Sequence, residues 1–166
     1  PTNTRAELTR ELNELFRPAN LNLDIRFKHE VSAGESFGDV VVVRMQGTCK
    51  MIAMPTGFDG RGPYAWAHTV DGRVLPFVEV QCDKVRRSVG EARSMGQKKI
   101  LDGDRLMGRA LARVIAHEVM HIKGDTTGHG ESGVFRHALK PVELVADKVT
   151  IHADDLERLA APAPRD

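Results

Sequence analysis

His117-Glu118-Val119-Met120-His121 is the stretch that decides how this chain folds. Apolar residues recur at helical spacing through the sequence around it, and they predict a buried amphipathic helix over residues 104–123. The apolar positions are Leu106, Ala110, Leu111, Val114, Ile115, Val119 and Ile122. On such a helix the two histidines project from one face, one turn apart.

The spacing of the two histidines is typical of a metal site. Two imidazoles four residues apart on a helix can bind one Zn²⁺, with each nitrogen at about 2.0–2.1 Å from the ion. Glu118 then points beside the metal, where a carboxylate can take the proton of the water that the metal activates. The sequence therefore predicts His117 and His121 as zinc ligands and Glu118 as the general base. A chance match and a structural histidine pair are the alternatives.

A catalytic zinc ion usually has a third protein ligand and one open position. His129 is the first histidine after the helix, and it lies in a glycine-rich loop. Gly124 is well placed to end the helix in a left-handed turn that sends this loop back towards the metal. We therefore predict His129 as the third ligand, with Asp125 and Glu131 as weaker candidates.

The HExxH motif and its flanks resemble the metzincin clan of zinc peptidases, whose usual form is HExxHxxGxxH. This chain departs from that form, because Thr127 stands at the position of the third histidine and His129 follows two residues later. The longer spacing is similar to that of a group of secreted, largely uncharacterised bacterial zincin-like proteins. Phe135 stands where that group, which carries Gly-Ile-Met-Arg there, has a methionine under the zinc site.

The resemblance implies a zinc-dependent metalloendopeptidase that acts on a peptide or protein substrate. One catalytic Zn²⁺ would be bound by His117, His121 and His129, and Glu118 would act on the water. The implied fold is an α+β zincin, a metzincin-like catalytic domain over residues 1–160. A zincin-like domain that binds zinc or a partner without hydrolysing peptides is the alternative from another functional class.

A second family offers a different third ligand. The thermolysin-like gluzincins supply a glutamate from a second helix, at a distance similar to that between His121 and Glu143, with an aspartate one turn later. Asp147 would be that aspartate, orienting a ligand histidine. Without this role, Glu143 is an ordinary acidic residue in the first turn after Pro141, where the helix dipole favours it.

The N-terminal half predicts a backing helix and a small twisted mixed sheet. Thr4 and Glu7 form a capping-box pattern that opens a helix reaching about Arg17, with Leu8, Leu12, Leu15 and Phe16 turned inward. Residues 21–27 alternate apolar and polar and predict a half-buried strand. Residues 40–45 are mostly β-branched and predict a central strand covered on both faces.

Further elements follow from turn and cap signals. Residues 64–70 and 75–82 flank Asp71-Gly72 and predict a β-hairpin. Residues 83–96 predict a short helix with Asp83 as its N-cap and Gly96 at its end. Residues 142–159 predict one C-terminal helix, which forms a small helical subdomain, and the Pro- and Ala-rich residues 161–166 predict a disordered tail.

The hairpin is expected to border a substrate-binding cleft between the sheet and the zinc site. Ala65-Trp66-Ala67-His68 is similar in type and position to the strand that lines the cleft of matrix metalloproteases, and a free strand edge can pair with an extended peptide. We expect Trp66 in the core rather than in the cleft wall. His68 is expected to be a strand residue near the cleft that does not bind the metal.

Several residues are candidates for contact with a substrate. Tyr64 and His137 are nominated as a second donor to the oxyanion that forms during hydrolysis. An apolar pocket beside the metal is expected to be lined by Val134, Phe135 and Leu139.

Composition excludes several functions. A net charge of +1 gives no field that would attract nucleic acid or a membrane surface, and no run of eighteen apolar residues could span a bilayer. Cys49 and Cys82 are either a disulfide or two buried thiols. The resemblance favours the disulfide, because the secreted group that this chain resembles has a cysteine in the sequence context of Cys49 and another in that of Cys82. We therefore expect a secreted or periplasmic monomer.

Overall fold

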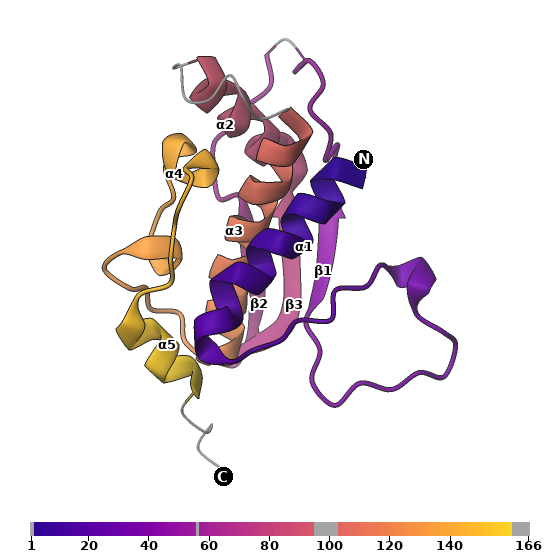
Figure 1. Ribbon diagram of the computed structural model, residues 1–166, viewed down its shortest axis with the longest axis vertical. Coiled ribbons are helices and arrows are strands. Elements are labelled where there is room, and N and C mark those ends of the chain that lie inside the picture. Colours follow the sequence, from indigo (N-terminus) through magenta and orange to yellow (C-terminus); the bar gives the residue numbers. More distant parts are fainter. Residues whose placement is uncertain (1, 56, 95–102, 161–166) are drawn as a thin grey trace.

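The HExxH motif lies on a long helix, α3 (Gly103–Lys123), whose position in the chain agrees with the prediction. A computed structural model describes residues 2–55, 57–94 and 103–160. Every residue of α3 from 106 to 116 is buried, including Gly108, Ala110, Ala112 and Ala116. Because these small side chains allow close packing, α3 lies at the centre of the fold, between α1 (Thr2–Phe16) and a sheet (Figure 1).

Helix α1 packs along α3 with the predicted face. Leu8, Leu12, Leu15 and Phe16 are all buried. The predicted capping box is wrong, because α1 begins at Thr2 and Thr4 therefore lies inside the helix. The buried hydroxyl of Thr4 has no hydrogen-bond partner among the residues described, and Glu7 bonds to Arg10 and Arg109.

Helices α1 and α3 approach each other closely at Gly108. A Cβ atom there would lie 2.3 Å from the carbonyl oxygen of Thr4 and 3.1 Å from the backbone nitrogen of Leu8. We expect Gly108→Ala to lower the free energy of unfolding by about 1–3 kcal/mol, because neither backbone atom can move aside. Urea denaturation measures this change. Gly90→Ala is the control: its Cβ would meet nothing within 4 Å, so the better helix propensity of alanine should raise stability.

The sheet is mixed and has the order β1-β3-β2. β3 (Arg73–Gln81) lies between β1 (Val42–Gln46), which runs parallel to it, and β2 (Ala65–Val70), which runs antiparallel. The predicted hairpin is confirmed. Asp71 and Gly72 join β2 to β3 with φ values of 50° and 79°, as a two-residue hairpin turn requires.

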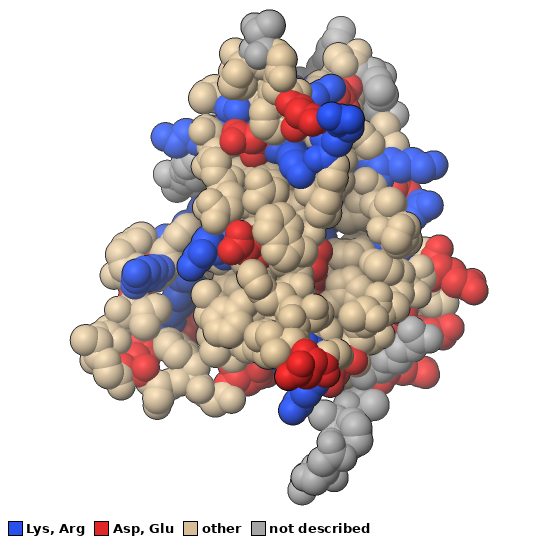
Figure 2. All heavy atoms as spheres, turned by 180° about the vertical axis from the view of Figure 1, so that it is seen from behind, with Lys and Arg blue, Asp and Glu red and all other residues tan. Residues whose placement is uncertain are grey.

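The two faces of the sheet have different environments. Val78 and Val80 of β3 are buried beneath the helices, whereas Phe77 is exposed on the outer face. Figure 2 views the molecule from behind, and uncharged residues form most of the middle of this face. The prediction of a central strand at residues 40–45 is wrong: β1 is an edge strand, and Val42 is 47% exposed.

Residues 21–27 do not form the predicted strand. Leu21, Leu23 and Ile25 still pack against the core while the residues between them are exposed, so the alternation identified the correct face. Within the described part of the chain, no strand pairs with the backbone of this segment. Instead the Leu23 N–H donates to the side-chain oxygen of Asn13 at 3.2 Å.

The C-terminal helix predicted at residues 142–159 is two helices, α4 (Pro141–Val145) and α5 (Ala153–Ala160). The carbonyl groups of Val145 and Ala146 accept hydrogen bonds from the side chain of Arg109 and not from a next helical turn. The chain is extended after that point, with Ala146 at ψ 154°.

Helix α2 (Cys82–Ser94) follows β3 directly, and the predicted disulfide is confirmed. Cys49 is bonded to Cys82, with 4.9 Å between their Cα atoms. Asp83 lies in the first turn of α2 and not at its N-cap.

The predicted helix end at Gly96 and the predicted tail at 161–166 lie outside the residues described. Among those described, no helix is long and apolar enough to cross a bilayer.

Candidate metal centre

Three imidazoles converge beside α3. His117 and His121 project from α3, and His129 reaches the same point from the loop that follows. One nitrogen from each ring can be chosen so that all three lie within 4.8 Å of one another. The structure therefore brings together the three histidines that the sequence nominated as ligands.

Backbone carbonyl groups fix the orientation of the two helical histidines. Nδ1 of His117 donates to the carbonyl oxygen of Val134 at 2.9 Å, and Nδ1 of His121 donates to that of Thr126 at 2.7 Å. Because a carbonyl group only accepts, each Nδ1 carries the proton and each Nε2 keeps its lone pair.

The two Nε2 atoms lie 3.2 Å apart. Two nitrogens bound to one tetrahedral zinc ion at about 2.0–2.1 Å would be separated by about 3.3 Å. Two lone pairs that face each other at this distance repel unless a cation lies between them. The donor set therefore fits one metal ion.

Burial keeps these imidazoles in the neutral form that binds metal. It lowers the pKa of His117 to about 4, although the hydrogen bond to Val134 opposes the shift. The pKa values of His121 and His129 are also lowered, with burial again the largest cause. All three rings are therefore neutral at pH 7, so a metal ion need not displace a proton from them.

A specific turn carries the chain from α3 into the metal loop. Asp125, and not the predicted Gly124, adopts the left-handed conformation, with φ 40°. The Asp125 N–H donates to the carbonyl of Ile122 and the Thr126 N–H to that of His121, which are the two bonds of a Schellman motif. This turn also places the carbonyl of Thr126 beside the ring of His121.

Phe135 packs against all three rings of the cluster. Its ring centroid lies 5.6 Å from that of His117, 4.8 Å from that of His121 and 5.9 Å from that of His129. Phe135 is buried, in the short 3₁₀ helix Gly133–Phe135. It therefore forms an apolar support for the cluster. The secreted bacterial zincin-like proteins that the motif resembles have a methionine at this position.

Glu118 shares an open cavity of about 640 Å³ with the three histidines. Its side chain is buried, and Oε2 accepts a hydrogen bond of 2.8 Å from the backbone N–H of Ala67 in β2. Burial raises the pKa of this carboxyl group to about 7, and the bond from Ala67 opposes the rise. A carboxyl group with this pKa can both accept and release a proton near neutral pH.

The rival ligands are bonded elsewhere. Glu143 accepts hydrogen bonds from Arg136 at 2.5 Å and from the Lys140 N–H at 2.7 Å. Asp125 accepts from the Val74 N–H, and Asp147 pairs with Arg109. These three residues and the exposed Glu131 lie outside the histidine cluster.

The nominated cleft residues occupy different environments. Trp66 lines the cavity and is 37% exposed, so the expectation of a core tryptophan is wrong. His68 points to the outer sheet face, 3.6 Å from Glu79, and is not among the residues that line the cavity. Tyr64 lines the cavity, but its hydroxyl group is hydrogen-bonded to Ser88 at 2.9 Å. His137 lines it beside His129, with 3.5 Å between the Nδ1 atoms.

The apolar wall of the cavity differs from the prediction. Leu139 lines it as expected, whereas Val134 and Phe135 are buried behind it. Val114 lines it too, and the sequence reasoning missed this role. The signal was present, since Val114 precedes Glu118 by one helical turn and therefore shares its face.

No protein-family model, curated protein or solved structure matches this chain. A function must therefore be argued from the residues of the site and their geometry.

Proposed function

We propose that this protein is a zinc-dependent endopeptidase of the zincin type. The observation that carries the proposal is the meeting of three neutral imidazoles and a buried carboxyl group at one open cavity. Three histidines leave a tetrahedral ion one free position, which is the arrangement of catalytic rather than structural zinc sites. When bound, zinc activates a water molecule and polarises the carbonyl group under attack.

Glu118 is oriented to move a proton in this reaction. Its Oε2 accepts the Ala67 N–H, which leaves Oε1 to take a proton from water. The same oxygen can then deliver that proton to the nitrogen of the leaving amine. The alternative, a zinc-binding domain without hydrolysis, gives no reason for a carboxyl group to be buried at this position.

The cavity suits an extended peptide. β2 pairs with β3 along one edge, and Ala65, Trp66 and Ala67 line the cavity. A peptide could pair with the edge of β2 that faces away from β3, where the Ala67 N–H is already bonded to Glu118, and place an apolar side chain against Val114 and Leu139. Among the two nominated donors to the oxyanion, His137 is favoured, because the hydroxyl group of Tyr64 is already bonded to Ser88.

A secreted or periplasmic location agrees with this proposal. The disulfide between Cys49 and Cys82 is consistent with an oxidising compartment. The expected partners remain a peptide or protein substrate, with no nucleic acid and no membrane, and the expected oligomeric state remains a monomer.

The zinc-loaded protein is expected to cleave peptides from an unstructured library, and chelation should abolish this cleavage. Removal of the ion takes away the activated water, so we expect the rate to fall at least about 100-fold and to recover with one equivalent of Zn²⁺. Mass spectrometry of the library before and after chelation measures the effect. A protein with one bound zinc that cleaves no peptide would support the non-hydrolytic alternative.

A further inference from the structure

Side chains along one side of α3 are hydrogen-bonded to the backbone of residues 126–146. Arg109, Arg113, His117 and His121 are spaced four residues apart and so lie along one side of the helix. All four side chains donate to backbone carbonyl groups between residues 126 and 146, which are those of Ala146, Glu143, Val134 and Thr126. The two helical histidines of the cluster thus continue a row of donors that two arginines begin.

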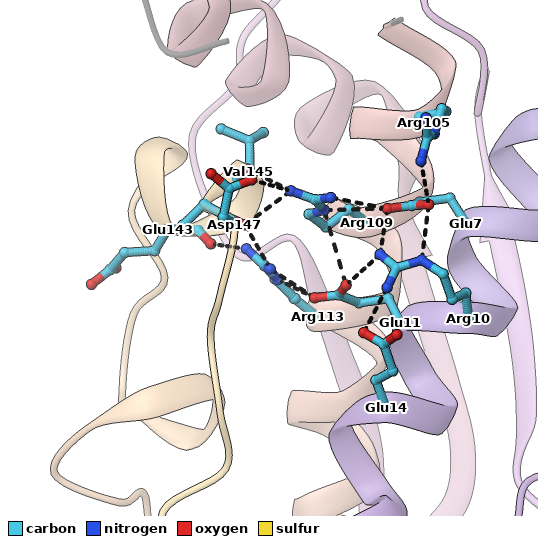
Figure 3. Close-up of polar contacts among 11 residues, drawn as sticks. Glu7, Arg10, Glu11, Glu14, Arg105, Arg109, Arg113, Glu143, Val145 and Asp147 are labelled. Carbon is cyan, nitrogen blue, oxygen red and sulfur yellow. Dashed lines mark hydrogen bonds and ion pairs between the residues drawn. The ribbon is translucent and has the colours of Figure 1, made fainter. Parts of the chain in front are cut away.

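The segment between α3 and Ala146 depends on such donors because it has little regular structure. Its helical parts are Gly133–Phe135 and the five residues of α4. The carbonyl groups at the end of so short a helix have no partners within it. Arg113 donates to the carbonyl of Glu143 at 2.6 Å (Figure 3). It also donates to the carbonyl of Ala146 at 2.8 Å.

Two acidic residues of α1 make these buried arginines possible. Arg113 is fully buried, and its Nε donates to Glu11 at 2.8 Å, while Arg109 donates to Glu7 at 3.1 Å. A buried charge without a partner is costly, whereas an apolar side chain could fill the same space at no such cost. An apolar side chain, however, could not donate to the carbonyl groups of α4.

The contacts continue from Arg113 to the loop of His129. Glu143, whose carbonyl Arg113 holds, binds the side chain of Arg136 at 2.5 Å. Arg136 pairs with Gly130 in an isolated β-bridge, and the Gly130 N–H donates to the carbonyl of Phe135 at 2.9 Å. Gly130 directly follows His129, so the series joins the buried arginines to the backbone of the loop beside His129 through consecutive contacts.

We propose that Arg109 and Arg113, each paired with a glutamate of α1, are positioning residues that fix the loop of His129 onto α3. They touch neither the metal position nor the cavity. The proposal rests on the proposed function only in taking His129 as a ligand. The anchoring of the loop can be measured without any metal.

The test replaces the buried pair Arg113 and Glu11 together, as Arg113→Met with Glu11→Leu, which removes the donors without leaving a lone buried charge. The control is Leu12→Ala, which weakens the same interface of α1 and α3 without touching the loop. Amide hydrogen exchange is followed by NMR in the metal-free proteins. We expect the amides of Gly130 and Val134 to exchange at least tenfold faster in the double variant, relative to the amides of α3, and not in the control.

Zinc affinity gives a second readout. The double variant should bind zinc at least tenfold more weakly and show an altered visible spectrum with Co²⁺, whereas Leu12→Ala should match the wild type in both. Unchanged exchange at Gly130 and Val134 in the double variant would overturn the proposal. If the wild type binds no metal, the proposed function fails but the exchange result still decides. Should the double variant not fold, Arg113→Lys, which keeps the charge but loses the paired donors, takes its place.

Discussion

Glu118→Gln is expected to lower kcat/KM for peptide hydrolysis by about 10²–10⁴-fold and to leave the zinc content unchanged. Glutamine has nearly the same shape, and its side-chain oxygen can still accept the Ala67 N–H, so the cavity should keep its form. The amide cannot take a proton from water, however. The loss should therefore appear in turnover rather than in metal binding or folding.

Turnover of a fluorogenic peptide and zinc by elemental analysis, both on the same preparation, measure this effect. Glu131→Gln is the matched control, because Glu131 is an exposed acidic residue in the metal loop and lies outside the histidine cluster. It should behave as the wild type. Normal hydrolysis by Glu118→Gln would show that another group accepts the proton.

His129→Ala is expected to lose zinc under mild chelation and washing that leave the wild type fully loaded. With one of three ligands removed, we expect the affinity to fall at least about 100-fold, which is more than the loss of an outer hydrogen-bond partner causes. Glu143→Ala should keep most of its zinc, because the Glu143 carboxylate is bonded to Arg136 and Lys140. Elemental analysis of the three proteins in parallel measures the difference.

The opposite pattern would identify a different site. If Glu143→Ala alone lost its zinc, Glu143 would be the third ligand, as in the gluzincins, and the loop after α3 would follow another path. A closed site that uses both residues would lose zinc in either variant and would not bind a hydroxamate inhibitor.

The spacing of apolar residues correctly predicted the helices whose buried side chains form one continuous stripe along the helix. The apolar face of α1 and the extent of α3 agree with the sequence prediction, because each helix packs a single face or is buried all round. The Asp71-Gly72 turn was equally clear, since few residues accept two successive left-handed conformations.

The predictions of secondary structure were wrong where contacts with distant residues, and not the local sequence pattern, determine the backbone conformation. The alternation at residues 21–27 placed its apolar side chains correctly, but among the residues that the structure describes no strand is hydrogen-bonded to that backbone. The pattern at 142–159 continues through the end of α4, where Arg109 and Arg113 take the carbonyl groups that a longer helix would need. A helical pattern cannot reveal an acceptor already bonded to a distant arginine.

In the candidate site, too, some residues could be predicted from the sequence and others could not. Residue type and spacing were sufficient to nominate His117, Glu118 and His121, and the next histidine in the chain was the third member of the cluster. The side chains around them were harder to place. Trp66 became part of the cavity wall because β2 is an edge strand, a property of the sheet that no single segment encodes.

The three histidines belong to one short segment, residues 117–129, whereas Arg109 and Arg113 are 102 positions from their partners in α1. Closing the short loop costs little chain entropy, and contacts between distant segments form more slowly. The proposed zinc ion could therefore be captured while α1 is still unpaired. The ion would then help to order this part of the chain during folding, before it takes any part in chemistry.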